Sequence, residues 1–257
     1  MYDLALRRRA IKLHEGGLSF SEVSRLMGVS RSAIRQWTEC APPPPRAAGD
    51  CPLQGGELNV GILPGDYAYL LGLYLGDGCI SASARGVYAL RISCCDGWPG
   101  LLNLCDNAIR AVMPRNSVCR VQAVGCTQVV SYSKHWPCLF PQHGPGLKHL
   151  RRITLVPWQR EVVNAHAWDL VRGLIHSDGC RITNWTTKRI GGTVKRYEYP
   201  RYFFTNMSQD IVDLYTATLD RVGVAWTASR RRAGAVNVSV ARRESVALMD
   251  QYIGPKY

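Results

Sequence analysis

Hydrophobic and polar residues follow a helical spacing over the first forty residues, where the pattern predicts three short helices. Apolar residues at helical spacing occupy the segment 7–15, and a pair of glycines follows it. Ser19 or Ser21 can cap a second helix that ends at Gly28, and Ser30 can cap a third. The three helices predict a small helical domain over residues 1–39.

The turn between the second and third helices favours a helix-turn-helix. Gly28 permits the left-handed conformation that sets two helices at a steep angle. The residues expected to fill the small core are Val23, Leu26, Val29 and Ile34. The side chains that the third helix would offer to a DNA major groove are Arg31, Ser32, Arg35 and Gln36. A helical hairpin used only for protein contact is the alternative interpretation.

A proline-rich segment separates this domain from the rest of the chain. The run Pro42-Pro43-Pro44-Pro45 favours a stiff, extended conformation. We therefore expect a linker over residues 40–65. Cys40 and Cys51 lie beside the prolines, but a zinc site would need two further ligands that this neighbourhood does not offer.

The remaining sequence contains two copies of one pattern. Residues 70–79 recur as residues 171–180, and each copy ends in Asp-Gly-Cys, with Asp77 and Asp178 separated by 101 positions. Each copy is followed by segments that read strand, strand, helix, strand, strand, helix. We expect an α+β fold with two pseudo-symmetric αββαββα repeats, over residues 66–166 and 167–257.

Small residues within the two repeated helices predict that the helices pack closely. A glycine inside a helix costs about 1 kcal/mol relative to alanine, so its repeated use needs a packing reason. The small residues at this expected interface are Gly72, Gly76, Gly173 and Ser177. Such a crossing would bring Asp77 and Asp178 side by side, where a divalent cation would relieve their repulsion. The alternative is that each Asp-Gly pair only ends a helix.

These residues resemble the LAGLIDADG homing-endonuclease family, in its single-chain form with two motifs, over residues 66–253. The resemblance implies a saddle of antiparallel sheets in the DNA major groove and metal-binding acids at Asp77 and Asp178. With the residues that precede them, Gly76 and Ser177, these acids are expected to form a site for Mg2+ or Mn2+. The family also places a basic catalytic residue near the end of the fourth strand of each repeat. Lys134 and Arg242 fit that place.

The family motif is not matched at every position. Leu75 and His176 stand where the motif has its first acidic residue, although both final acids are present.

The charge of the chain indicates a polyanionic partner. Lys and Arg number 32 against 19 Asp and Glu, which gives a net charge of +13 and a pI of about 9.5. Residues 151–257 hold 17 of the basic residues and 9 of the acidic ones, and the basic clusters there alternate with aromatic residues. A solvated charged surface is the alternative for any one cluster. In the two repeats, the expected DNA-binding residues are Arg85, Arg91, Lys188, Arg189, Lys195, Arg196, Arg201, Arg230, Arg231 and Arg232.

Other features of the composition concern compartment and metal. The 257 residues contain no apolar stretch long enough to cross a membrane and no apolar N-terminal segment, so we expect a cytoplasmic protein, nucleoid-associated in a prokaryote. The ten cysteines are then expected as free thiols. The segment between the repeats contains candidate ligands for a second metal site, for zinc, with loose spacing. Its candidate ligands are His135, Cys138, His143 and His149.

The sequence therefore predicts a monomer that binds double-stranded DNA and cleaves it with a divalent metal. The first alternative is a helix-turn-helix transcription regulator that uses a non-cleaving LAGLIDADG scaffold. A role in RNA processing is a third possibility, which the helix-turn-helix disfavours because that module binds duplex DNA.

Overall fold

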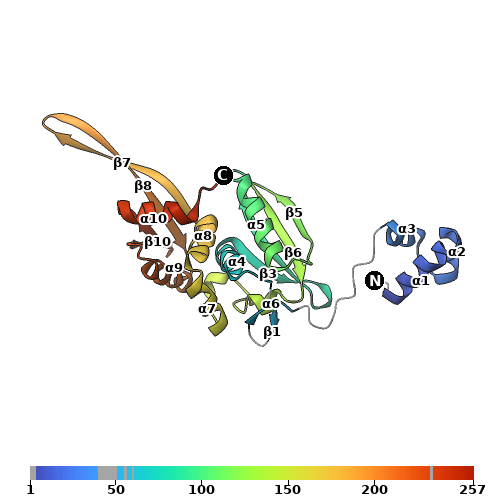
Figure 1. Cartoon of the computed structure of the whole chain (residues 1–257). Helices are drawn as coiled ribbons and strands as arrows, with labels where there is room; N and C mark the ends of the chain where they lie inside the picture. Colours follow the sequence, from blue (N-terminus) through green and yellow to red (C-terminus); the bar gives the residue numbers. More distant parts are fainter. Residues whose placement is uncertain (1–3, 40–50, 55–56, 60, 232–233) are drawn as a thin grey trace. The chain divides into compact units, whose positions relative to one another are not determined.

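A computed structural model describes residues 4–39, 51–54, 57–59, 61–231 and 234–257. The chain divides into two compact units, Met1–Asp50 and Cys51–Tyr257, each of which is described by itself (Figure 1). The proline run and Cys40 lie outside the described residues. Among the described residues, no helix has both the length and the apolar character needed to span a bilayer.

The first unit consists of helices α1 (Leu4–Glu15), α2 (Phe20–Met27) and α3 (Arg31–Glu39). Ser19 caps α2, because its hydroxyl accepts a hydrogen bond from Glu22 N at 3.3 Å while the Glu22 carboxylate accepts one from Ser19 N at 2.8 Å. Gly28 has φ of 64°, the left-handed conformation predicted for the turn.

The core of this unit differs from the prediction at one position. Its buried residues are Ala10, Val23, Val29, Ile34 and Trp37. Leu26 was expected among them but is 66% exposed. The reason is that Met27, one turn after Val23, packs against this core and places Leu26 on the solvent side of α2.

The second unit contains two repeats of the expected α+β pattern, which confirms the predicted fold class. The elements of the first repeat are α4 (Pro64–Asp77), β3 (Gly78–Ala82), β4 (Tyr88–Cys95), α5 (Pro99–Val112), β5 (Val118–Ala123), β6 (Cys126–Ser133), α6 (Trp136–Leu139) and α7 (Pro157–Ala165). Those of the second are α8 (Ala167–Asp178), β7 (Gly179–Ile190), β8 (Thr193–Asn206), α9 (Gln209–Arg221), β9 (Thr227–Arg230), β10 (Val236–Val240) and α10 (Arg243–Ile253).

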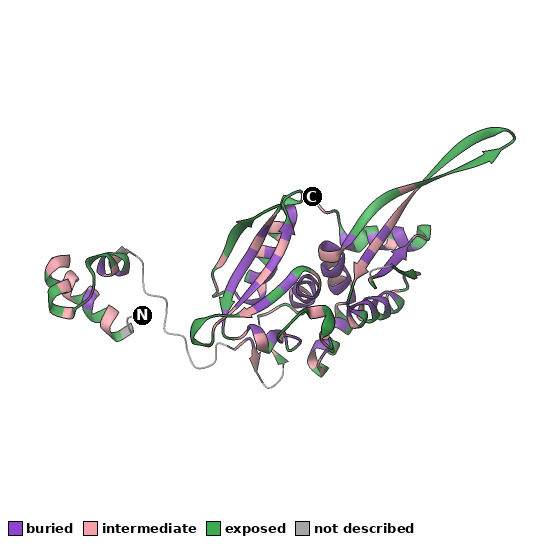
Figure 2. Cartoon of the chain, turned by 180° about the vertical axis from the view of Figure 1, so that it is seen from behind, coloured by how far each residue is buried: buried purple, intermediate pink, exposed green. Residues whose placement is uncertain are grey.

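Each repeat forms a four-stranded antiparallel sheet, with strand orders β3-β4-β6-β5 and β7-β8-β10-β9. Alternate strand residues are buried against the helices, as Leu90 and Ile92 are in β4 and Tyr202 and Phe204 in β8. Figure 2 shows the buried residues concentrated in the central helices α4 and α8 and along the sheets that flank them. Among the described residues, the helices of each repeat cover one side of its sheet, and the other side is here called the open face.

The β7–β8 hairpin is longer than the sequence pattern suggested. The sequence pattern predicts strands only over residues 180–187 and 196–205, but the strands continue to a turn at Gly191-Gly192, where both glycines have positive φ. Every residue from 185 to 198 is exposed. This segment, the basic arm, projects beyond the rest of the sheet (Figure 1).

The predicted linker was too long at its C-terminal end. Strands β1 (Leu53–Gln54) and β2 (Glu57–Leu58) pair as a short hairpin within it. Leu53, Leu58 and Ile62 pack against the core of the repeats. The second unit therefore begins at Cys51, because these three side chains are partly covered by its core.

Candidate functional site

Two glycines lie face to face where α4 crosses α8. A Cβ added to Gly72 would be 2.8 Å from the Cα of Gly173, and one added to Gly173 would be 2.9 Å from the Cα of Gly72. Gly76 faces Ser177 in the same way, with room for no side chain. The backbones therefore touch, and the carboxyl ends of both helices are held together.

Asp77 and Asp178 are the last residues of these two helices. A Cβ on Gly76 would lie 3.4 Å from the Asp178 Cγ, which places that carboxyl group beside the end of α4. Burial, and then the negative charge of Asp178, raise the pKa of Asp77 to about 6. Burial also raises the pKa of Asp178. Two carboxyl groups in this condition form a site where a cation is strongly favoured.

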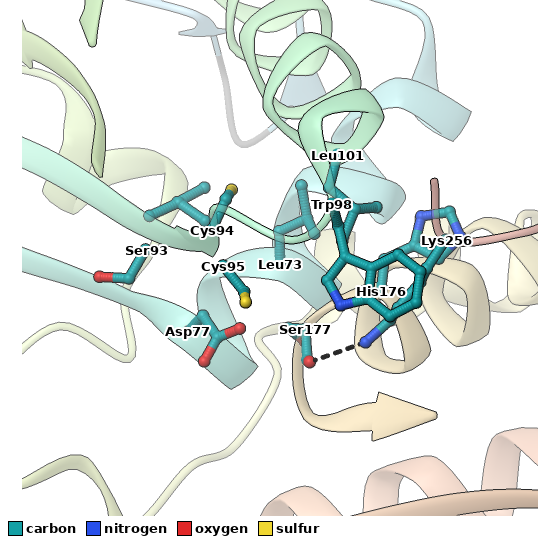
Figure 3. Close-up of a pocket in the computed structure, with 11 residues that line it drawn as sticks. Leu73, Asp77, Ser93, Cys94, Cys95, Trp98, Leu101, His176, Ser177 and Lys256 are labelled. Carbon is teal, nitrogen blue, oxygen red and sulfur yellow. Dashed lines mark hydrogen bonds between the residues drawn. The ribbon is translucent and has the colours of Figure 1, made fainter. Parts of the chain in front are cut away.

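The two carboxyl groups have different neighbours. Asn206 Nδ2, at the end of β8, donates a hydrogen bond to Asp178 Oδ2 at 2.6 Å and opposes the rise of its pKa. The sheet registers place Cys94 at the corresponding position of the first repeat. Asp77 instead lines a cavity of about 230 Å³ with Cys95, His176, Lys256 and other residues (Figure 3).

A lysine from a distant segment closes the end of α4. The Lys148 ammonium donates hydrogen bonds to the carbonyl oxygens of Tyr74, Leu75 and Gly76 at 2.6, 2.9 and 2.8 Å. These carbonyls carry the negative end of the helix dipole, so the contact is favourable. Burial lowers the pKa of Lys148 to about 8, although Asp178 and Asp77 oppose that shift.

A second lysine does the same for α8. Lys256, which follows α10, donates to the carbonyl oxygen of Ser177 at 3.2 Å (Figure 3) and also to that of Gly179. Burial lowers its pKa, while Asp77 and Asp178 raise it. The helices α4 and α8 carry the repeated motif and are here called the motif helices. The pseudo-symmetry of the repeats thus extends to one lysine at the carboxyl end of each motif helix.

The basic residues predicted near the end of the fourth strands, Lys134 and Arg242, lie just after those strands. Lys134 is exposed directly after β6, and Arg242 is the exposed N-cap residue of α10. The cations whose charges lower the pKa values of both aspartates are Lys148 and Lys256. Lys148 begins a short 3-10 helix (Lys148–Leu150) and Lys256 follows α10, and no local pattern in the sequence marks either residue.

His176 is buried next to this centre. Its Nδ1 lies 2.9 Å from the Tyr69 hydroxyl, and it is 4% exposed. Burial first, and then the positive charges of Arg172 and Lys256, lower the pKa of His176 to about 4, so the ring is neutral at neutral pH. Leu75, at the matching position of the first repeat, is fully buried.

Cations and aromatic rings share the open face of the second sheet. Register places Arg201 there between Tyr199 and Phe203, whose ring centroids lie 5.6 and 5.4 Å from its guanidinium carbon. Further along the basic arm, Lys188 pairs directly with Lys195 across the two strands. Like charges opposite each other destabilise a strand pair, so this pairing favours an anionic partner.

Other residues of the second repeat that were predicted to contact DNA do not lie on the open face. Arg189 and Arg196 alternate with the open-face residues; Arg196 lies over the Trp185 ring, 5.0 Å from its centroid, and pairs with Glu198 at 2.7 Å. Arg230 donates to Gln209 of α9 at 3.2 Å, which places it on the helix side of the sheet. Arg231 is exposed beside Arg230, and Arg232 lies outside the described residues.

The predicted contacts elsewhere are accessible to different degrees. Arg91 lies on the open face of the first sheet and donates a hydrogen bond to Ser81. Arg85 is exposed at the tip of the β3–β4 connection, with φ of 63°. In the first unit, all four residues predicted to read bases are exposed on α3: Arg31, Ser32, Arg35 and Gln36.

Comparisons with known proteins found similarities for both units. The model of the Homeodomain-like domain family matches residues 1–41. A comparison with curated proteins found no match. Among solved structures, mesophilic variants of the homing endonuclease I-DmoI align with a TM-score of 0.51 and 16% identity, over 75% of this chain and 97% of theirs.

Two I-DmoI complexes give the same result. I-DmoI with DNA and Mn aligns with a TM-score of 0.51 and 16% identity, over 76% of this chain and 99% of that one. I-DmoI with DNA and Ca aligns with a TM-score of 0.51 and 18% identity, over 75% and 91%. At this identity the likeness concerns the fold: the two repeats have the LAGLIDADG homing-endonuclease fold, as the repeated motif predicted.

Proposed function

We propose that this protein binds a specific sequence of double-stranded DNA and hydrolyses its phosphodiester bonds with the help of divalent metal ions. The observation that carries the proposal is the pair Asp77 and Asp178, at the joined ends of two helices, with pKa values raised by burial. Such a pair favours bound cations, and it lies at the centre of two sheets whose open faces suit a duplex.

The donor atoms at this centre suit Mg2+ or Mn2+. They are the carboxylate oxygens of Asp77 and Asp178 and the carbonyl oxygens of Gly76 and Ser177, all hard ligands. When bound, such ions activate a water molecule and stabilise the leaving oxygen. Lys148 and Lys256 hold the helix ends in place and neutralise charge near the phosphate, the role that the family resemblance implies for Lys134 and Arg242.

DNA binding is assigned to both units. In the second unit, Arg201 and the Lys188–Lys195 pair meet phosphates from the open face, and aromatic neighbours give the surface its shape. In the first unit, α3 enters a major groove. Tethered modules raise the effective concentration of each other on an extended site. The protein acts as a monomer, because the second repeat supplies the partner that a single-motif chain would need.

The test combines cleavage and binding on a randomised duplex library with Mg2+ or Mn2+. Wild-type protein is expected to enrich one sequence and to cut it. The Asp77→Asn, Asp178→Asn variant is expected to retain the enrichment and lose the cuts, whereas Glu244→Gln, an exposed carboxylate on α10, changes neither. Cuts that persist in the double variant would refute the assignment of the metal centre.

A transcription regulator on a non-cleaving scaffold is the second candidate, and one observation favours it. The Lys148 and Lys256 ammonium groups already bond to the Gly76 and Ser177 carbonyl oxygens, so they compete with a metal for two of its ligands. In that function the lysines balance the aspartates permanently. Enrichment of a bound sequence with no cuts under any divalent ion would establish it.

A further inference from the structure

Three metal-ligating side chains meet far from the aspartates in sequence. Cys51, His135 and Cys138 offer two sulfur atoms and a ring nitrogen that all lie within 4.8 Å of one another. Cys51 precedes the β1–β2 hairpin, and the other two residues follow β6. The cluster therefore joins the beginning of the second unit to the first repeat.

The turn that carries His135 and Cys138 is firmly anchored. His135 is the N-cap residue of α6, and Cys138 N donates a hydrogen bond to His135 O at 3.0 Å. Residues three apart on a helical turn share one side of it. Trp136 and Leu139, on the same turn, are fully buried, and Trp136 Nε1 donates to Ser131 O at 2.9 Å. The core thus fixes the spacing of the two ligands.

Cys51 is held by its own hairpin. Asn59 Nδ2 donates to Cys51 O at 2.6 Å, and Asn59 N donates to Pro52 O at 2.9 Å. Leu53 and Leu58 pack against the core and prevent the hairpin from drifting. All three ligands are therefore positioned by structure that does not depend on the cluster itself.

The chemistry of the three ligands selects the metal. Zinc binds cysteine at about 2.3 Å and histidine at about 2.0 Å in a tetrahedron, so its ligand atoms lie about 3.3–3.8 Å apart. Small side-chain adjustments within this cluster reach that spacing. Thiolates and imidazole suit zinc and disfavour Mg2+ or Mn2+, which prefer oxygen. Cys138 is exposed, so the fourth position of the tetrahedron is accessible to a water molecule.

We propose that Cys51, His135 and Cys138 bind a zinc ion that fastens the β1–β2 hairpin to the first repeat. This site differs from the set His135, Cys138, His143 and His149 that the sequence suggested. His143 instead packs edge-on against the Tyr88 ring with centroids 5.5 Å apart, and His149 is exposed. The proposal is independent of DNA cleavage, since it concerns other residues and another class of metal.

Metal analysis of the full chain tests the ligand set. Protein purified with reductant and without added metal is expected to contain stoichiometric zinc. Cys51→Ser, Cys138→Ser and His135→Gln are expected to lose it, whereas His143→Gln, His149→Gln and Cys119→Ser, a variant at an exposed cysteine on β5, keep it. Zinc lost from the His143→Gln or His149→Gln variant would overturn this ligand set.

Spectroscopy keeps the test decisive if a ligand variant folds poorly. Cobalt added to the zinc-free wild-type protein is expected to produce a thiolate charge-transfer band and the strong visible bands of a tetrahedral site. Zinc removal is also expected to lower Tm by several degrees and to speed amide exchange in β1 and β2. A folded, reduced protein with no zinc and no cobalt spectrum would overturn the proposal, as would iron in place of zinc. A Cys51–Cys138 disulfide in protein whose reduced form takes up no metal would do the same.

Discussion

The two repeats share a centre and differ at their periphery. Both have a tightly packed motif helix, a terminal aspartate and a lysine on the helix carbonyls. The β3–β4 strands of the first repeat are short, whereas β7 and β8 extend into the basic arm. The open face of the first sheet presents Arg91, already bonded to Ser81, while that of the second presents Arg201, Lys188 and Lys195. Close packing fixes the centre, and the exposed strands are free to diverge.

The largest effect is expected from disrupting the close contact between α4 and α8, to which both repeats contribute. Gly72→Val should reduce the free energy of unfolding by about 3 kcal/mol, because its side chain would collide with the backbone of α8. Urea denaturation measures the change. Gly97→Ala is a matched control, since its added methyl group meets only the Cys95 sulfur at 3.6 Å. An unchanged midpoint for Gly72→Val would contradict the close helix contact.

The next effect concerns the different neighbours of the two aspartates. Asn206→Cys copies the first repeat into the second and removes the hydrogen bond to Asp178. It should raise the pKa of Asp178 and reduce stability by about 2 kcal/mol, as expected for a lost bond to a charged group. Carboxyl carbon NMR titration follows the pKa, with Asn184→Cys on β7 as the control. An Asp178 titration identical to that of the wild type would show that Asn206 does not act on it.

Substitutions in the basic arm test whether the two repeats contribute differently to DNA binding. Lys188→Ala combined with Lys195→Ala should weaken DNA binding roughly tenfold and lower the salt slope by about 2, one for each lost phosphate contact. Arg85→Ala combined with Arg91→Ala should have a smaller effect, because Arg91 is already engaged with Ser81. The measurement is the DNA affinity of each variant across a series of salt concentrations. Equal losses from both pairs would mean that the two repeats contact DNA alike.

A smaller effect concerns the ionisation at high pH of one buried tyrosine in each repeat. Burial raises the pKa of both Tyr67 and Tyr215, so stability is complete below the unfolded pKa of about 10 and falls above it. Tyr215→Phe should remove about 1 kcal/mol of that loss at pH 11 and change little at pH 7.

Tyr67 supplies the contrast for that measurement. Tyr67→Phe should already destabilise the protein at pH 7, because the Tyr67 hydroxyl donates to Leu139 O and accepts from Gln159 Nε2, both at 2.6 Å. Denaturant curves at pH 7 and 11 separate the two cases. A Tyr215→Phe variant with the pH dependence of the wild type would contradict the burial of that hydroxyl.

Sequence reasoning succeeded where the pattern is local or repeated. The recurrence of residues 70–79 at 171–180 predicted the fold and its two halves, because helix and strand periodicity survive in a single sequence. The first and second helices of the N-terminal domain were found from caps and glycines for the same reason.

The features that escaped prediction depend on tertiary contacts. Lys148 and Lys256 are far in sequence from the ends of α4 and α8 that they contact, and only the folded chain brings them there. Cys51 was assigned to a linker, although the chain folds back to place it beside His135 and Cys138. The full length of the basic arm is an exception, because it was missed although the sequence has a local signal for it. Gly191-Gly192 suits a two-residue hairpin turn.

The opposed lysines of the arm have a thermodynamic consequence. Lys188 and Lys195 face each other on a ribbon whose residues are all exposed, so the free hairpin is locally frustrated. An anion that neutralises both side chains relieves that repulsion and thereby orders the strands, which couples binding to folding of the tip. Added salt should then have two opposite effects. It should stabilise the unbound hairpin by screening the repulsion between the lysines, and it should lower the affinity of the hairpin for a polyanion.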